Sequence, residues 1–159
     1  MAYVLGFFTA EGSMYKTKRG THFIDLGFMQ NKTKVIRLPS VPREYFCDFL
    51  RGYLDGDGNV MFGYYRKSGR DYLNKYFAAR FTSGSRLLLE DIKDALMGIV
   101  GNGSVYFSGG GWRLSYGSHA SEKLFQFMYH NGGLGSLIYL ERKYKIFQRA
   151  TNAVVAQFG

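Results

Sequence analysis

Apolar residues recur along the chain with two different periods, and these periods separate helices from strands. Strands are predicted where every second residue is apolar, at residues 13–28 (two strands joined by a basic turn), 59–67, 72–82, 103–107 and 112–116. Helices are predicted where the apolar spacing is three or four residues, at residues 2–10, 43–54, 85–100, 118–129 and 137–150. We therefore expect an α+β fold in which an antiparallel sheet packs against helices.

A nine-residue segment occurs twice, at residues 4–12 and 50–58. Each copy carries two small residues four positions apart, so both lie on one face of a helix. These residues are Gly6 and Ala10 in the first copy, and Gly52 and Gly56 in the second. Two such faces let helix backbones approach more closely than the usual distance of about 8–10 Å. The repeat predicts a seam where the two helices pack through these small residues.

An acidic residue directly follows each small face, Glu11 in the first copy and Asp57 in the second. The C-terminal end of a helix carries about half a negative charge, so a carboxylate there is unfavourable. If two such helix ends lie side by side, bound cations or protonation would relieve the repulsion between their negative charges. Oxygen ligands suit Mg²⁺, and two metals about 3.5–4 Å apart support in-line phosphodiester displacement. The pattern predicts that Glu11 and Asp57 hold divalent metal and act catalytically.

The charge and composition narrow the class of partner. The formal net charge is +9, which favours a polyanion, and 46% hydrophobic residues argue against disorder. The single Cys47 excludes an internal disulfide and a cysteine-rich zinc site. No apolar run approaches the roughly 18 residues that span a membrane, and no signal peptide is recognisable. We expect a cytoplasmic protein that binds nucleic acid, with no membrane or small-molecule partner.

Strand parity predicts a nucleic-acid-binding face. Polar, basic and tyrosine side chains collect on one face of the sheet, which fits a DNA major groove. The residues predicted to contact DNA from it are Asn59, Met61, Tyr65, Lys67, Tyr72, Asn74, Tyr76, Arg80, Arg113 and Ser115. Basic residues before the second repeat are predicted to bind DNA phosphates, and they are Lys16, Lys18, Arg19, Lys32 and Lys34. Parity assigns to the core Val60, Phe62, Tyr64, Leu73, Phe77, Ala79 and Phe81. The charged run 141–145 is predicted to be a solvated helix face.

The two repeated segments resemble the motif of the LAGLIDADG homing endonucleases. The second copy, FLRGYLDGDG at residues 49–58, matches closely, and the first has Thr9 where the family often has Asp. The resemblance implies that the motif helices pack at the centre and that Glu11 and Asp57 bind metal at the DNA backbone. The backbone carbonyls of Ala10 and Gly56 are further candidate ligands.

The resemblance also implies an activity and a partner. We expect a sequence-specific endonuclease of the homing type, associated with an intron or intein, that hydrolyses double-stranded DNA. Its cofactor would be Mg²⁺ or another divalent cation such as Mn²⁺ or Ca²⁺. A non-cleaving DNA-binding regulator and an RNA-splicing maturase are the alternatives on the same fold.

The two halves of the chain are unequal. We expect a reduced first half at residues 1–42, with motif helix 2–11, and a complete second half at residues 43–159, with motif helix 43–57. The second half follows the α-β-β-α-β-β-α order of the family. The family often places a lysine near the metals, and the matching position here is Ser118, next to His119. We expect either a monomer with a one-sided DNA site or a homodimer that covers a strand edge at residues 21–25.

Overall fold

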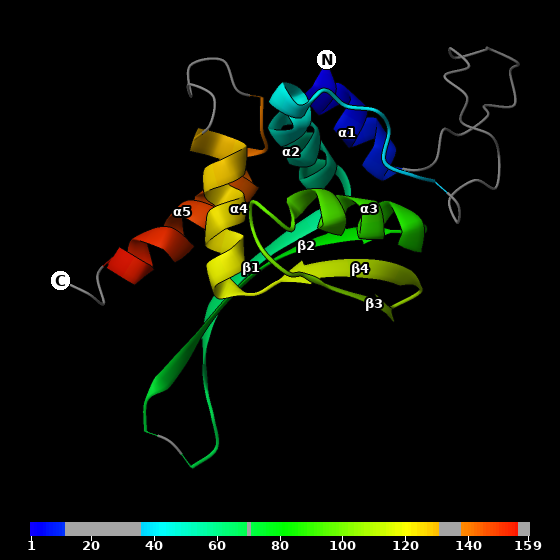
Figure 1. Ribbon diagram of the computed structural model, residues 1–159. Helices are drawn as coiled ribbons and strands as arrows, with labels where there is room; N and C mark the ends of the chain where they lie inside the picture. The colour runs from blue at the N-terminus through cyan, green and yellow to red at the C-terminus, as the bar shows by residue number, and fades with distance from the viewer. Residues whose placement is uncertain (12–35, 70, 131–137, 156–159) are drawn as a thin grey trace, which may run out of the picture.

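The computed structural model describes residues 1–11, 36–69, 71–130 and 138–155 (Figure 1). Its elements are α1 (Ala2–Glu11), η2 (Arg43–Tyr45), α2 (Phe46–Asp57), β1 (Gly58–Arg66), β2 (Leu73–Ser83), α3 (Arg86–Leu96), β3 (Ser104–Ser108), β4 (Gly111–Tyr116), α4 (Ser118–His130) and α5 (Glu141–Val155). From α2 onward this order confirms the predicted α+β arrangement. The strands predicted within residues 13–28 lie outside the described residues, and the division into two halves stays a prediction.

The four strands form one antiparallel sheet in the order β1-β2-β4-β3. β1 and β2 make a long hairpin that reaches well beyond the helices (Figure 1). Helices α2, α3, α4 and α5 all contact the sheet, and they lie to one side of it. None of the described helices has the length and apolar character that a membrane crossing requires.

The core lies between the helices and one face of the sheet. Strand residues buried on this face are Val60, Phe77, Ala79, Phe81, Leu114 and Tyr116. Tyr53 of α2 packs on Phe81 with ring centroids 6.0 Å apart, and Phe147 of α5 meets Phe77 edge-on at 5.7 Å. The side chains of alternate strand residues are therefore covered by helices, as strand parity predicts.

Three residues that parity assigns to the core are not buried. Tyr64 is 51% exposed and Leu73 57% exposed, while Phe62 is half-buried. All three lie on the helix side of the hairpin, but toward its projecting end. The assignment of Tyr64 and Leu73 to the core was wrong because the hairpin extends past the helices that cover the rest of the sheet (Figure 1).

Helix α3 is shorter than the apolar pattern suggests. Ser85 caps its N-terminus by accepting a hydrogen bond from the Leu88 N–H. The helix ends at Leu96, whose carbonyl accepts from the N–H groups of Val100 and Gly101. Gly101 has a φ of 102°, a conformation that favours glycine. The predicted continuation to Val100 is therefore a turn, which keeps Ile99 and Val100 against the core.

Hydrogen bonds hold the segment before η2 and α2 against Ser85 and α3. The Asp91 carboxylate accepts from the Arg37 guanidinium at 2.7 Å and from the Leu38 N–H at 3.1 Å. The Ser85 hydroxyl donates to the Ile36 carbonyl at 2.7 Å. These contacts set the position from which η2 and α2 begin.

Candidate metal and nucleic-acid site

Helices α1 and α2 touch through the small residues of the repeat. A Cβ added to Gly6 would lie 1.9 Å from the Phe49 carbonyl oxygen, and one added to Gly52 would lie 1.9 Å from the Tyr3 carbonyl oxygen. A Cβ on Gly56 would lie 2.7 Å from the Cβ of Ala10. Each glycine thus lies directly against the other helix, where a side chain has no room.

These contacts obey a local two-fold relation. Gly6 lies against Phe49 and Tyr53, and Gly52 lies in the same way against Tyr3 and Phe7. The two helices therefore run side by side in the same direction (Figure 1). Because Ala10 and Gly56 are in contact, the backbones at the next residues, Glu11 and Asp57, are also close to each other.

The acidic residues occupy these two helix ends. Glu11 is the last residue of α1, and its side chain lies outside the described part of the structure. Asp57 is the last residue of α2, and its side chain is exposed. Within the described residues, no three or more histidine, cysteine, aspartate or glutamate side chains gather into a cluster. The closeness of the two carboxylates stays a prediction.

A buried lysine caps the end of α2. The Lys143 ammonium donates to the carbonyl oxygens of Leu54 at 2.5 Å, Asp55 at 3.0 Å and Gly58 at 2.7 Å. Its charge meets the negative end of the helix dipole, and it adds a second donor to the Leu54 carbonyl, which also accepts from the Gly58 N–H. Burial lowers the pKa of Lys143, and the nearby carboxylates of Asp55 and Asp57 partly oppose this shift. Lys143 thus supplies a positive charge at the end of α2 that was not predicted from the sequence.

The prediction of a solvated face at residues 141–145 was wrong for Lys143, which is 4% exposed. Glu141, Arg142 and Lys145 are exposed, as expected. Lys143 belongs instead to the helical stripe that contains the fully buried residues Phe147 and Ala150. That spacing of four and seven residues was the sequence signal that could have revealed it.

Ser118 is not the residue beside Asp57. It begins α4, and its hydroxyl donates to the Phe77 carbonyl at 3.2 Å. Phe77 lies four residues along β2 from Phe81, the partner of Gly58. At about 3.3 Å per residue this separation is roughly 13 Å. Among the described residues, the lysine in contact with the motif end is Lys143, on α5.

Asp55 joins three helices next to the same end of α2. Its Oδ2 accepts from the Tyr3 hydroxyl of α1 at 2.9 Å and from the Leu140 N–H, just before α5, at 2.8 Å. Burial raises the pKa of the Asp55 carboxyl, and the hydrogen bonds from Leu140 and Tyr3 partly oppose this. The start of α5 is thus tied to the α1–α2 seam, which sets the position of Lys143.

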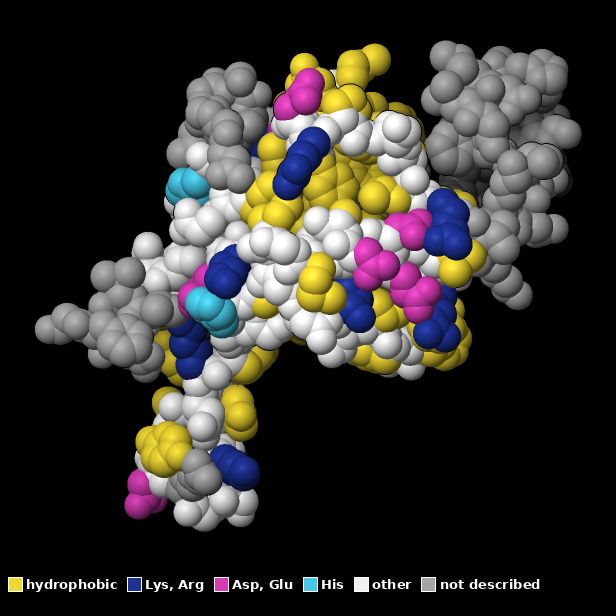
Figure 2. Space-filling model, viewed as in Figure 1, with side chains coloured by type: hydrophobic (Ala, Val, Ile, Leu, Met, Phe, Trp, Pro, Cys, Tyr) yellow, Lys and Arg dark blue, Asp and Glu magenta, His cyan; other side chains and the backbone are white. Residues whose placement is uncertain are grey.

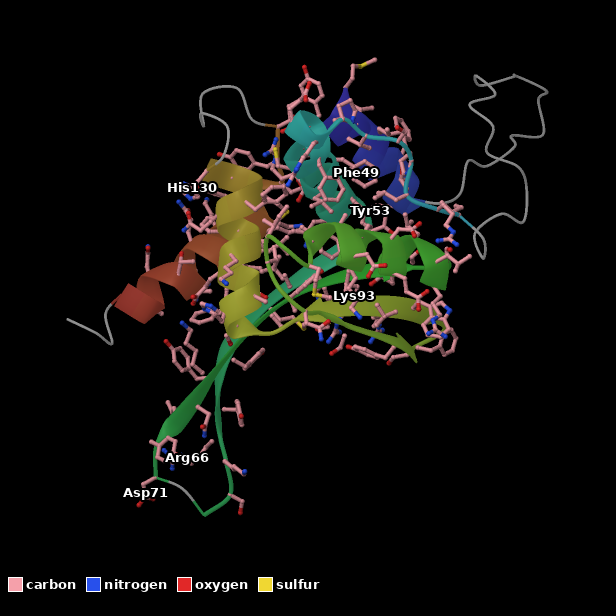
Figure 3. All side chains as sticks on the ribbon, viewed as in Figure 1. Phe49, Tyr53, Arg66, Asp71, Lys93 and His130 are labelled. Atoms are coloured by element: carbon pink, nitrogen blue, oxygen red, sulfur yellow. The ribbon has the colours of Figure 1, made fainter. Side chains whose placement is uncertain are left out.

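The residues predicted to contact DNA share the sheet face opposite the helices. Asn59, Arg80 and Ser115 form one row across β1, β2 and β4. Tyr65 pairs with Asn74, and the other members of this face are Met61, Tyr76 and Arg113. Lys67 and Tyr72 flank the two strands at the hairpin end, where Figure 3 shows Arg66 and Asp71. The basic residues Lys16, Lys18, Arg19, Lys32 and Lys34 lie outside the described residues.

Sequence reasoning missed part of this face. Register places Thr82 of β2 and Tyr106 of β3 on either side of Arg113, and Ser104 beside Ser115. Alternation along β3 could have identified Ser104 and Tyr106. In the described part of these four strands, no aspartate or glutamate belongs to the face. Acidic side chains gather instead over α3, which carries Glu90, Asp91 and Asp94 (Figure 2).

No protein-family model and no curated protein matches the chain. Solved structures match it at low identity. The LAGLIDADG meganuclease I-AabMI bound to uncleaved DNA has a TM-score of 0.52 and 18% identity, over 70% of this chain and 38% of that one. The homing endonuclease I-TnaI has a TM-score of 0.51 and 16% identity, over 76% of this chain and 74% of that one.

The K262A mutant of I-SmaMI has a TM-score of 0.54 and 16% identity, over 77% of this chain and 40% of that one. Another I-SmaMI structure holds an uncleaved DNA target in the presence of calcium ions. The match spans less than half the length of I-AabMI and of this I-SmaMI chain. The paired motif helices and the four-stranded sheet give this chain the fold of the LAGLIDADG homing endonucleases.

Proposed function

We propose that this protein is a metal-dependent, sequence-specific endonuclease that cuts double-stranded DNA. The observation that carries the proposal is the close contact between α1 and α2. Each of these helices ends in an acidic residue, and the two ends are neighbours. The polar sheet face without carboxylates supplies a surface for a polyanion. The fold shared with DNA-bound meganucleases supports the same function.

The donors at the seam fit a hard divalent cation. Asp57 is exposed at the helix end, so its carboxylate is accessible to a phosphate, and all the candidate donors are oxygen atoms. Glu11 and Asp57 would hold the metal, with the carbonyls of Ala10 and Gly56 as further ligands. Mg²⁺, Mn²⁺ or Ca²⁺ bound there would offset phosphate charge, and Mg²⁺ or Mn²⁺ would also acidify an attacking water.

The family often has a lysine near the metals, and the matching position in this sequence is Ser118; we infer that Lys143 supplies a positive charge at the motif end instead. Its ammonium holds three carbonyls around Asp57, which restricts how the end of α2 can move. It also reduces the negative charge that an approaching DNA phosphate would meet. We assign Lys143 to positioning the motif end and to favouring phosphate approach.

The sheet face would bind the major groove. Arg80 and Arg113 lie on strands β2 and β4 with Asn59 and Ser115 nearby, a combination of donors and acceptors suited to base edges. Arg113 is oriented by a hydrogen bond of 3.3 Å to the Ser108 hydroxyl. These residues would therefore read sequence, while basic residues elsewhere would hold phosphates.

The test is Asp57→Asn, assayed on duplexes selected from a randomised library with and without Mg²⁺. Asp57 is exposed, so the exchange should leave the fold intact. We expect cleavage to disappear while DNA binding is unchanged or tighter, because a carboxylate that repels phosphate is removed. Loss of binding together with cleavage, in a chain that still folds, would contradict the assignment.

A non-cleaving DNA-binding regulator is the second candidate. The segment 12–35 between α1 and Ile36 is less than half as long as Gly58–Tyr116, which builds the four-stranded sheet. The first half therefore has too little chain for a matching sheet. Specific duplexes recovered without any cutting in Mg²⁺ would favour a regulator. Preference for a folded RNA over those duplexes would favour an RNA-splicing maturase.

A further inference from the structure

The two-fold relation between α1 and α2 contains one unequal pair of contacts. The Tyr3 hydroxyl donates across the seam to Asp55 at 2.9 Å. The rotation that exchanges Gly6 with Gly52 also exchanges Tyr3 with Phe49 and Asp55 with Thr9. At the symmetry-related positions, Phe49 has no hydroxyl to donate, and the Thr9 hydroxyl donates to the Leu5 carbonyl of its own helix at 2.7 Å. At this pair of symmetry-related positions in the described helices, a side-chain hydrogen bond crosses the seam from Tyr3, and Thr9 bonds within its own helix.

We propose that this asymmetry makes α2 select the chain's own α1 and reject the α2 of a second copy. If two copies paired through α2, each Asp55 would face a Phe49 ring in place of the Tyr3 hydroxyl. Asp55 is 3% exposed, and its Oδ1 already lacks a hydrogen-bond partner among the described residues. Removing a donor from a buried carboxylate is strongly unfavourable.

The small residues alone could not make this choice. Gly52 and Gly56 would accept another α2 as readily as α1, because the contact obeys a two-fold relation and such surfaces are self-complementary. Pairing through α2 would also bring two four-stranded sheets together, so it is the assembly that α1 must exclude. Tyr3 is the residue that excludes it, and the seam stays within one chain.

The test moves the hydroxyl to the other helix. In Tyr3→Phe/Phe49→Tyr, two copies of α2 could form two tyrosine–Asp55 hydrogen bonds, and the in-chain seam would lose its own. We expect the dimer dissociation constant to fall by at least about a hundredfold, because two hydrogen bonds to a charged group are gained and each is worth roughly tenfold or more. By light scattering, Tyr3→Phe and Phe49→Tyr alone should each dimerise more weakly than the double variant and more strongly than the parent chain, because each removes only part of the preference.

A thiol reports which helices are paired. With Cys47→Ser in the background, Asp57→Cys should form an interchain disulfide only where two α2 helices meet. We expect covalent dimer on oxidation of the double variant and none in the chain that keeps Tyr3 and Phe49. Covalent dimer in that chain would overturn the proposal, as would a folded double variant that stays monomeric.

Asp55→Thr is a second variant in case the exchanged aromatic residues unfold the chain. It gives α2 the residue that α1 has at the matching position, so the carboxylate no longer opposes self-pairing. We expect the introduced thiols to cross-link in it, and a folded Asp55→Thr chain without cross-link would also overturn the proposal. Mass and cross-linking are independent of cleavage, so these results stand whether or not the protein cuts DNA.

Discussion

At the scale of single residues, Lys143 offers three hydrogen bonds to backbone carbonyls from a buried ammonium. Lys143→Met removes the charged donor that all three carbonyls share at the end of α2. We expect the free energy of unfolding, from urea denaturation, to fall by about 3 kcal/mol. The matched control is Lys145→Met, since Lys145 is exposed and pairs with exposed Glu141. Its change should stay below about 0.5 kcal/mol, and equal losses would contradict the capping role.

Neighbouring residues on β2 test which sheet face meets DNA. Phe81 is fully buried, so Phe81→Ala should lower the free energy of unfolding by about 3–5 kcal/mol. Arg80 lies on the opposite face, so Arg80→Ala should weaken binding to the selected duplex with little change in melting temperature. Binding titration and thermal denaturation of both variants decide it. The reverse outcome would mean that the helix-covered face carries the DNA contact.

At the scale of elements, the α1–α2 seam depends on glycine for space. Alanine normally stabilises a helix interior relative to glycine by about 0.5–1 kcal/mol. Gly52→Ala should instead destabilise, because its Cβ would meet the Tyr3 carbonyl oxygen at 1.9 Å and push the helices apart. Gly98→Ala is the control, since no atom lies within 4 Å of its Cβ. A Gly52→Ala melting temperature at or above that of the control would contradict close helix contact.

At the scale of the whole molecule, we expect sequence-specific contacts on one side of the DNA cleavage site and mainly phosphate contacts on the other. The described sheet belongs entirely to the segment after α2, and the segment 12–35 is too short to build an equal one. Base contacts from one sheet specify sequence, while basic residues of the first part would contribute phosphate contacts that carry little sequence information. Selection from a randomised duplex library should therefore recover information on one side of the cut. Equal specificity on both sides by a proven monomer would refute this.

Features that depend on local spacing could be predicted from the sequence alone. Small residues four apart in both repeats predicted the helix contact, because residues at that spacing share a face. Alternation along β1, β2 and β4 separated Phe77 and Phe81 from Arg80 and Arg113, because side chains of a strand alternate between its faces. The order of elements after residue 43 followed from the same two periods.

Which helices cover each sheet face, and how far they extend over it, became clear from the arrangement of the elements in space. Periodicity placed Tyr64 and Leu73 on the helix side of the sheet, but the helices end before the hairpin does, so both stay exposed. It could not show that Lys143 meets the end of α2, because those carbonyls come from a helix almost ninety residues away in the chain. Nor could it show that the Tyr3 hydroxyl donates across the seam to Asp55 while the Thr9 hydroxyl bonds within its own helix. Contacts between distant segments depend on how the helices dock, and local spacing carries no information about docking.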